Sequence, residues 1–362
     1  MTKGYLILET GEEFAGDWIG AENEITGEVV FNTSMTGYQE MMTDPSYAGQ
    51  ILMFCYPLIG NYGINNEDNE SKRPAVSAVI ASDVWGEPSH YQSASSFSDR
   101  LEEANIPGLK NVDTRALVAV IRKHQTVRGK IVTAKNNEDR RNEWQDKHSL
   151  DLVKQVSVQE QETYGNGSYH VVLVDFGYKK SILDALLLED CKVTIVPFDT
   201  SFDAIEDLRP DGILLSNGPG DPIEMAEYFP MIKALTENFP TLGICLGHQL
   251  IALAYGGKTK KMPFGHRGGN HPVKELLTGK VRMTSQNHGY VVEGDSVDKE
   301  AFHVLFQNVN DKSLEGIKHV SLPVQSVQFH PEAHPGPSDT EYIFKNFIQQ
   351  VVTSGGSKYV EA

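Results

Sequence analysis

The chain has 362 residues, with 32 basic against 49 acidic side chains and a formal net charge of −17. Binding to nucleic acid or to an anionic membrane surface needs a basic footprint, so this balance argues against both kinds of partner. A hydrophobic content of 40% and a charged content of 22% are typical of globular proteins. The length is sufficient for two domains that each bury a core.

The chain has three cysteines, Cys55, Cys191 and Cys245. A small, odd number of cysteines does not suit a disulfide framework and indicates a reducing compartment. The N-terminal segment lacks the basic region, apolar region and cleavage site of a signal peptide. No run reaches the ~18 apolar residues that a membrane span requires. We therefore expect a soluble, cytoplasmic protein.

The first part of the chain predicts β-strands and short helices, separated by turns rich in glycine and proline. A helix is expected at 112–124, where Asp113 is a plausible N-cap. Leu117, Val120, Ile121 and His124 then lie on one face of that helix. Runs typical of β-strands occur at 5–10, 27–34, 75–82 and 129–134.

A change in composition divides the chain. We expect a first domain at 1–154, a polar, glycine-containing linker at 155–168, and a second domain at 169–356. Within the first domain, the strongly polar stretch 136–147 suits an exposed helix.

The second domain begins with an alternation of apolar strands and helices, which predicts a mostly parallel sheet built from right-handed βαβ units. The expected strands are 170–177, 191–198, 212–217 and 241–245, and the expected helices are 179–190, 201–208, 225–239 and 246–257. The remainder is rich in β-strand signals, with strands expected at 281–292, 302–309, 315–320 and 323–330 before a helix at 340–352.

The strongest chemical signal is the sequence GICLGHQ at 243–249, where an expected strand meets an expected helix. It matches the nucleophile elbow, with Cys245 in the place of serine. Flanking glycines are needed because side chains would clash in so sharp a turn. The nucleophile then lies at a helix N-terminus, whose free N–H groups favour a thiolate and can hold an oxyanion. The alternative is a small buried core cysteine.

A second signal is His330-Pro331-Glu332, at the end of an expected strand. Residues two apart on a strand face the same way, so Glu332 can orient the imidazole of His330 in a Cys-His-Glu relay. Asp175 and Asp221 are rival orienting groups.

The third signal is SNGPGDP at 216–222, directly after an expected strand. It predicts a tight loop at the carboxyl edge of the sheet, where open α/β sheets bind ligands. The backbone N–H groups of Gly218 and Gly220 can complete an oxyanion hole.

Two other patterns fail. Gly257-Lys258-Thr259 resembles the end of a P-loop, but Ala252 occupies the first glycine position, so no ATP site is expected in this chain. Cys245 and His248 lack a second ligand pair at zinc spacing. No metal site is expected, and His266, His271 and His288 are interpreted as loop or core histidines.

Together these three motifs resemble the triad-type glutamine amidotransferase domain, over about 169–352. That group includes subunits of the synthases for GMP, CTP, anthranilate and carbamoyl phosphate. Among these, the chain resembles the small-subunit family of carbamoyl-phosphate synthase over nearly its whole length, by the sequences at 27–63, 112–123, 175–183 and 264–274.

The resemblance implies a family-specific N-terminal α/β domain followed by the amidotransferase domain. It implies hydrolysis of L-glutamine, with ammonia delivered to a separate large subunit that holds ATP with its metal ion. No cofactor is expected in this chain. Catalytic roles carry over to Cys245, His330 and Glu332. Glutamine contacts carry over to Ser46, Gly218, Gly220, Leu246, Gln249, Asn287, Gly289 and Tyr290.

Two alternatives remain open at this point. One is a free-standing glutaminase, or an amidotransferase subunit of another synthase. The other is a regulatory subunit that keeps the fold without the activity, which the intact triad disfavours.

Overall fold

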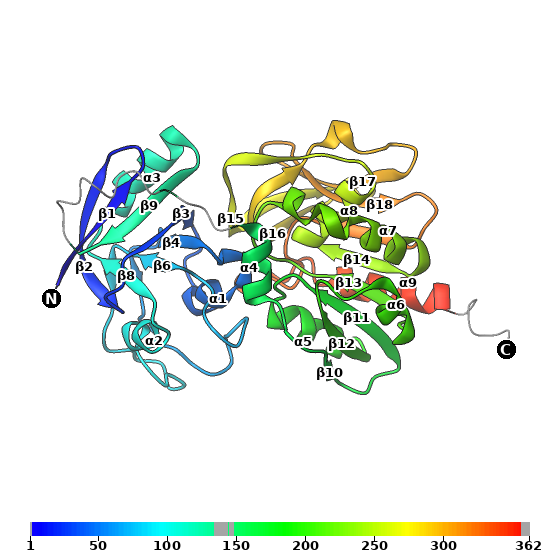
Figure 1. The fold of residues 1–362 in the computed structure, drawn as a ribbon, viewed down its shortest axis with the longest axis horizontal. Coiled ribbons are helices and arrows are strands. Elements are labelled where there is room, and N and C mark those ends of the chain that lie inside the picture. The colour runs from blue at the N-terminus through cyan, green and yellow to red at the C-terminus, as the bar shows by residue number, and fades with distance from the viewer. Residues whose placement is uncertain (1, 134–143, 145–147, 356–362) are drawn as a thin grey trace. The chain divides into compact units, whose positions relative to one another are not determined.

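The computed structural model describes residues 2–133, 144 and 148–355 (Figure 1). They fall into two compact units, Met1–Lys147 and His148–Ala362. The stretch expected as a linker, 155–168, belongs to the second unit, because β10 (Glu162–Tyr164) within it pairs with a strand of that unit's sheet. The boundary thus precedes the expected one. The helix expected at 136–147 lies, apart from Trp144, outside the described residues.

The first unit is a closed barrel of seven strands (Figure 1). The barrel order is β1 (Lys3–Leu8), β2 (Glu13–Gly20), β8 (Pro107–Lys110), β6 (Ala78–Ile80), β4 (Gln50–Phe54), β3 (Ile25–Asn32) and β9 (Val127–Val132). The strands β3, β4, β6 and β8 run parallel, and the other pairs are antiparallel. The family resemblance implied an α/β domain, but the sequence did not predict the closure, which depends on the pairing of β1 with the distant β9.

Both faces of the barrel strands are covered, as β4 illustrates. Ile51 and Met53 pack in one apolar cluster, and Leu52 and Phe54 pack in another, because successive side chains of a strand point to opposite faces. The elements outside the barrel are α1 (Tyr38–Thr43), η1 (Pro45–Tyr47), β5 (Leu58–Ile59), β7 (Asp83–Val84), α2 (Phe97–Glu103) and α3 (Thr114–His124).

Helix α3 begins where the sequence indicates, since the side chain of Asp113 accepts a hydrogen bond from the backbone N–H of Ala116. Leu117 and Ile121 are buried, whereas Val120 is half-buried. His124 was expected on the buried face and is exposed instead. Its Nε2 lies 3.7 Å from a carboxylate oxygen of Glu12. The polar ring is therefore near an acidic partner at the protein surface, and it does not pack in the core.

The second unit contains a ten-stranded sheet (Figure 1). Its central strands β12 (Cys191–Pro197), β11 (Tyr169–Asp175), β13 (Gly212–Leu215), β14 (Thr241–Ile244) and β19 (Val324–Val327) are parallel. The antiparallel remainder follows β19 in the order β18 (Leu314–His319), β17 (Phe302–Asn308), β15 (Thr259–Glu275) and β16 (Val281–Val292). This is the mostly parallel sheet that the alternating pattern predicts.

Helices cover both faces of this sheet. Val172 and Val174 of β11 pack in a cluster with α4 (Ser149–Val156), α6 (Phe202–Asp207), α7 (Phe229–Asn238) and α8 (Leu246–Ala254). Val171 and Leu173 pack on the other face with α5 (Lys180–Leu188) and α9 (Tyr342–Gly355). Strands buried on both faces explain the continuous apolar runs of the sequence.

The helix expected at 225–239 is divided in two. A 3-10 helix, η3 (Pro222–Tyr228), precedes α7, and Pro230 lies in the first turn of α7. Proline has no N–H and clashes with the preceding turn inside a helix, but it is tolerated in the first turn. A short 3-10 helix, η4 (Gly294–Ser296), follows β16. No described helix is long and apolar enough to cross a membrane.

Phe347 of α9 is completely buried against the sheet. We expect Phe347→Ala to lower the free energy of unfolding of the second unit by about 3–5 kcal/mol, because it removes a large apolar side chain and leaves a cavity. Val352→Ala, at an exposed position of the same helix, should change it by less than about 0.5 kcal/mol. Denaturant unfolding measures both, and equal effects would contradict the packing described for α9.

Candidate active site

Cys245 occupies a strained turn between β14 and α8. Its φ of 52° and ψ of −101° lie in a region that residues with a side chain rarely adopt. A Cβ on Gly243 would lie 2.8 Å from the carbonyl group of Gly247, and a Cβ on Gly247 would lie 2.2 Å from the carbonyl oxygen of Leu215. Both glycines are therefore required for the strand and helix to approach so closely.

The Cys245 sulfur lies in a buried polar environment at the N-terminus of α8. Its Sγ is 3.7 Å from the carbonyl oxygen of Asn287, and Gln328 Nε2 donates to it at 3.6 Å. The helix N-terminus favours negative charge at this point. Gln328 was not identified from the sequence, where it is one polar residue at the end of an expected strand.

His330 is oriented by Glu332, as the sequence suggests, with Nδ1 2.6 Å from Glu332 Oε1. The two residues lie beyond the end of β19, where His330 forms an isolated bridge with Ser285 and Ala333 N–H donates to the carbonyl of His330. A turn, rather than the strand geometry that we expected, thus brings the two side chains together.

Burial lowers the pKa of His330, but the neighbouring Glu332 carboxylate and the Cys245 side chain outweigh it, so that the pKa is raised above its ordinary value. Nε2 has no oxygen or nitrogen partner among the described residues. The imidazole can therefore hold the thiol proton on Nε2 while Nδ1–H remains donated to Glu332.

Lys179 is a buried partner of Glu332 that sequence reasoning missed. Its Nζ lies 3.2 Å from Glu332 Oε1 and donates to the carbonyl oxygen of Ala333 at 2.6 Å. Burial raises the pKa of Glu332, but the opposite effect of Lys179 and, after it, of His330 is larger, so that the pKa is lowered to about 2. Asp175 and Asp221, the rivals of Glu332, accept hydrogen bonds from backbone N–H groups elsewhere.

The loop 216–222 lies directly beside the first turn of α8. Gly247 N–H donates to the carbonyl of Ser216 at 3.0 Å, and a Cβ on Gly218 would lie 2.9 Å from a side-chain carbon of Leu246. Gly220 has a φ of +94°, which glycine adopts without strain. The structure thus brings the two halves of the expected oxyanion hole together.

Hydrogen bonds join several of the residues expected to contact glutamine to the surroundings of the nucleophile. Gln249 Nε2 donates to the carbonyl of Tyr290 at 2.8 Å and to Gln328 Oε1 at 3.0 Å, and Asn287 contributes the carbonyl beside the sulfur. Gly289 lies between Asn287 and Tyr290 on β16. Ser46 lies in the first unit, where its N–H donates to Asp44 at 2.9 Å. The role of Ser46 stays a prediction that the family resemblance supports.

A network of buried polar side chains holds the strand that carries these residues. His288 bonds the carbonyl of Tyr290 at 2.7 Å and Gln286 at 2.8 Å, and Gln286 donates to Glu315 at 2.9 Å. His266, His288 and Glu315 have ligand-type atoms within 4.8 Å of one another. Because most of these atoms already form hydrogen bonds with protein groups, we interpret the cluster as structural.

Two family models match the chain. Residues 172–350 match the class-I glutamine amidotransferase family, and residues 6–131 match the carbamoyl-phosphate synthase small chain, CPSase domain. The chain belongs to the carbamoyl-phosphate synthase small-chain family. It therefore carries the family's N-terminal domain and a glutamine amidotransferase domain, in the order that the sequence motifs indicate.

Curated relatives match the small chain over almost its full length. It is 51% identical to the carbamoyl phosphate synthase arginine-specific small chain of Bacillus subtilis, over 97% of each chain. It is 47% identical to the carbamoyl phosphate synthase small chain of Listeria monocytogenes serotype 4b, again over 97% of each. The solved structure of a glutamine amidotransferase from Thermotoga maritima is similar over 53% of this chain and 100% of that one, with 14% identity and a TM-score of 0.39.

Lys179→Met should lower the free energy of unfolding at pH 7 by about 3–5 kcal/mol, because it removes one of the two buried partners, Lys179 and His330, that stabilise the ionised Glu332 carboxylate. The folded-state pKa of Glu332 is depressed, so the stability that its ionisation contributes is complete above its unfolded pKa of about 4.3 and is lost as the pH falls towards about 2. The difference between wild type and variant should therefore shrink on acidification. Denaturant unfolding between neutral and acidic pH measures it.

The control is Lys180→Met, which removes the neighbouring lysine from an exposed pair with Asp184. It should change the free energy of unfolding by less than about 1 kcal/mol at any pH. A Lys179→Met effect of constant size at every pH would mean that Lys179 does not act through the Glu332 carboxylate.

Proposed function

We propose that this small chain hydrolyses L-glutamine at Cys245 and passes the ammonia to a carbamoyl-phosphate synthase large chain, which makes carbamoyl phosphate from bicarbonate and ATP. The observation that carries the proposal is the convergence of three groups from two separate segments, the elbow at Cys245 and the turn that holds His330 and Glu332. Cys245 lies in a strained elbow, and His330 is held by Glu332 at 2.6 Å. The match of residues 6–131 favours this synthase over others that use an amidotransferase.

The chemistry is acyl transfer. The Cys245 thiolate attacks the carbonyl carbon of the glutamine side chain, and the resulting oxyanion is held by N–H groups of Leu246 and of Gly218 or Gly220. Protonated His330 gives its proton to the nitrogen as the carbon–nitrogen bond breaks, which releases ammonia and leaves a glutamyl thioester. His330 then takes a proton from water, whose oxygen attacks the thioester. Glutamate leaves and the thiol is restored.

The remaining residues position these groups. Glu332 fixes the ring of His330 and stabilises its protonated state, and Lys179 holds Glu332 ionised. Asn287 beside the sulfur, and Gln249, Gly289 and Tyr290, which its strand and hydrogen bonds connect to it, suit contacts to the amino-acid part of glutamine. Ser46 is proposed as a further contact on the basis of the family resemblance.

We place ATP and its metal ion on the large chain, because no motif in this chain suits a nucleotide. A heterodimer of small and large chains is the simplest assembly. No nucleic-acid or membrane partner is proposed, in keeping with the net charge of −17. A cytoplasmic location is proposed because all three cysteines are free thiols.

Cys245→Ser should lower glutamine-dependent synthesis by at least about 10³-fold in the assembled enzyme, because a serine hydroxyl is far harder to ionise than a thiol. Synthesis from added ammonia should be retained, because the phosphorylation chemistry lies on the other chain. Steady-state carbamoyl phosphate formation with each nitrogen source measures both.

Cys55→Ser is the matched control. Burial raises the pKa of the Cys55 thiol to about 11 and that of Cys191 to about 12, so both thiols stay protonated at neutral pH and are poor nucleophiles. Glutamine-dependent synthesis that survives in Cys245→Ser, or that is lost equally in Cys55→Ser, would overturn the assignment of the nucleophile.

A further inference from the structure

Asp175, the last residue of β11, carries a completely buried carboxylate that the mechanism above does not use. Its Oδ1 accepts hydrogen bonds from the backbone N–H groups of Gly177 and Tyr178, both at 2.8 Å. Its Oδ2 accepts from the backbone N–H of Val158 at 2.7 Å. One side chain therefore joins the loop that follows β11 to the segment that follows α4.

The ionised carboxylate of Asp175 lowers the free energy of unfolding. Burial raises the pKa of Asp175 to about 6 although the three N–H groups oppose the shift. Since the folded-state pKa lies above the unfolded value, the contribution of this group to stability is greatest at low pH and is lost as the pH rises through about 6. A carboxylate kept at such a position suggests a function other than stability.

The loop that Asp175 holds contacts both halves of the active site. Phe176 N–H donates to Ser216 Oγ at 2.9 Å, and a Cβ on Gly218 would lie 2.3 Å from the carbonyl oxygen of Phe176. Lys179, at the end of the same loop, donates its backbone N–H to Asn217 Oδ1 at 3.2 Å while its Nζ pairs with Glu332. A shift of this loop would therefore move the Glu332 carboxylate together with the loop at 216–222, which we call the oxyanion loop.

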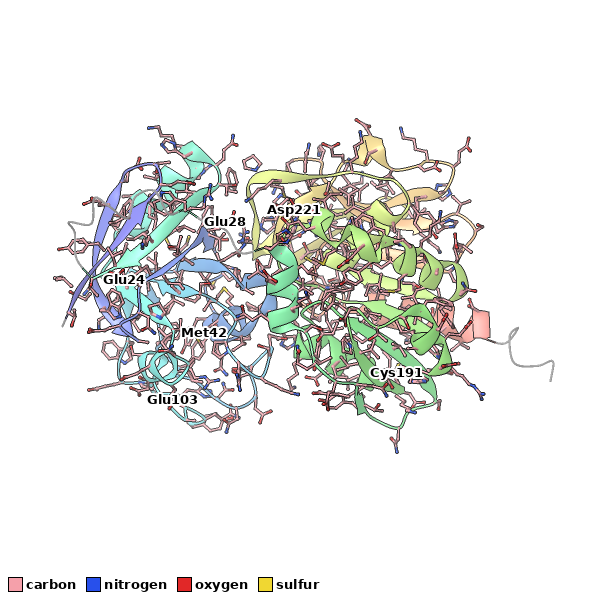
Figure 2. All side chains as sticks on the ribbon, in the orientation of Figure 1. Glu24, Glu28, Met42, Glu103, Cys191 and Asp221 are labelled. Carbon is pink, nitrogen blue, oxygen red and sulfur yellow. The ribbon has the colours of Figure 1, made fainter. Side chains whose placement is uncertain are left out.

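The segment on the other side of Asp175 reaches the same oxyanion loop. Ser149, the first residue of α4, accepts a hydrogen bond at its Oγ from the N–H of Asp221 at 2.8 Å (Asp221 is labelled in Figure 2). Its own N–H donates to Glu224 at 2.6 Å. A Cβ on Gly220 would lie 2.4 Å from the Ser149 Cβ. Helix α4 thus touches the oxyanion loop at its start and is tied to Asp175 just past its end.

We propose that Asp175 is a positioning residue for glutamine hydrolysis, whose two carboxylate oxygens hold the 176–179 loop and α4 in the arrangement that places the Gly218–Gly220 loop and Glu332 around Cys245. The inference rests on the proposed glutaminase function. It assigns Asp175 no contact with glutamine, so its loss acts on the rate of the chemical step and not on substrate affinity.

The test is Asp175→Asn in the assembled enzyme. The asparagine oxygen can still accept from Gly177 and Tyr178, but its amide nitrogen then faces the N–H of Val158, and two donors repel. A displacement of about 1 Å at a catalytic group costs on the order of 100-fold in rate. We therefore expect kcat for glutamine hydrolysis to fall between about 10- and 100-fold, with KM for glutamine changed less than about threefold. Synthesis from ammonia should be unchanged.

A second variant, Val158→Pro, removes the backbone N–H that donates to Asp175 Oδ2, and it also replaces a half-buried apolar side chain with the proline ring. Ser157 has extended backbone angles, which a following proline favours. It should lower kcat in the same direction without a change in KM. Asp184→Asn, at an exposed carboxylate of α5, is the matched control and should match wild type in all three measurements.

A kcat at the wild-type level in both folded variants would overturn the proposal, as would a parallel loss of ammonia-dependent synthesis or a rise in KM alone. Failure of the glutaminase function itself is distinguishable, because wild type would then release no glutamate. If Asp175→Asn does not fold, the kcat of Val158→Pro alone is decisive: a lowered kcat supports the proposal and a kcat at the wild-type level overturns it.

Discussion

The backbone conformation of Cys245 is the constraint on which the rest of the site depends. A residue with a side chain stays at a φ of 52° combined with a ψ of −101° only if the surrounding structure holds it there. The hold comes from β14, whose Gly243 touches Gly247, and from β13, whose Leu215 carbonyl leaves no room for a side chain at Gly247. The sulfur lies at the helix N-terminus only when the parallel sheet and α8 are packed together. The position of the nucleophile therefore depends on the fold of the whole second unit.

Around the sulfur, ionisable groups alternate in sign along a buried line. Lys179 faces Glu332, and Glu332 faces His330, whose free nitrogen remains for the thiol proton. Each charge compensates the desolvation of its neighbour. The same arrangement supports catalysis. The lowered pKa of Glu332 and the raised pKa of His330 keep a proton on the imidazole, from which it can be transferred to the leaving nitrogen.

Local signals allowed part of this to be predicted from the sequence. The elbow at 243–249 and the His330–Glu332 pair are short contiguous motifs, and the buried strands appear as apolar runs. Contacts between distant segments gave no such signal: Lys179 meets Ala333 across 154 positions, and Gln328 meets Cys245 across 83. The barrel of the first unit closes through β1 and β9 in the same way. The helix expected at 225–239 fails for a local reason, since Pro230 starts a new helix and cannot continue an old one.

The central claim is that Cys245 carries the glutamyl group during turnover. The most direct measurement is mass spectrometry of the chain after a rapid acid quench during glutamine hydrolysis, followed by peptide mapping. The account predicts a mass increase of one glutamyl group on the peptide that contains Cys245, absent from Cys245→Ser and retained in Cys55→Ser. An adduct on another residue, or steady hydrolysis with no adduct at any quench time, would contradict it.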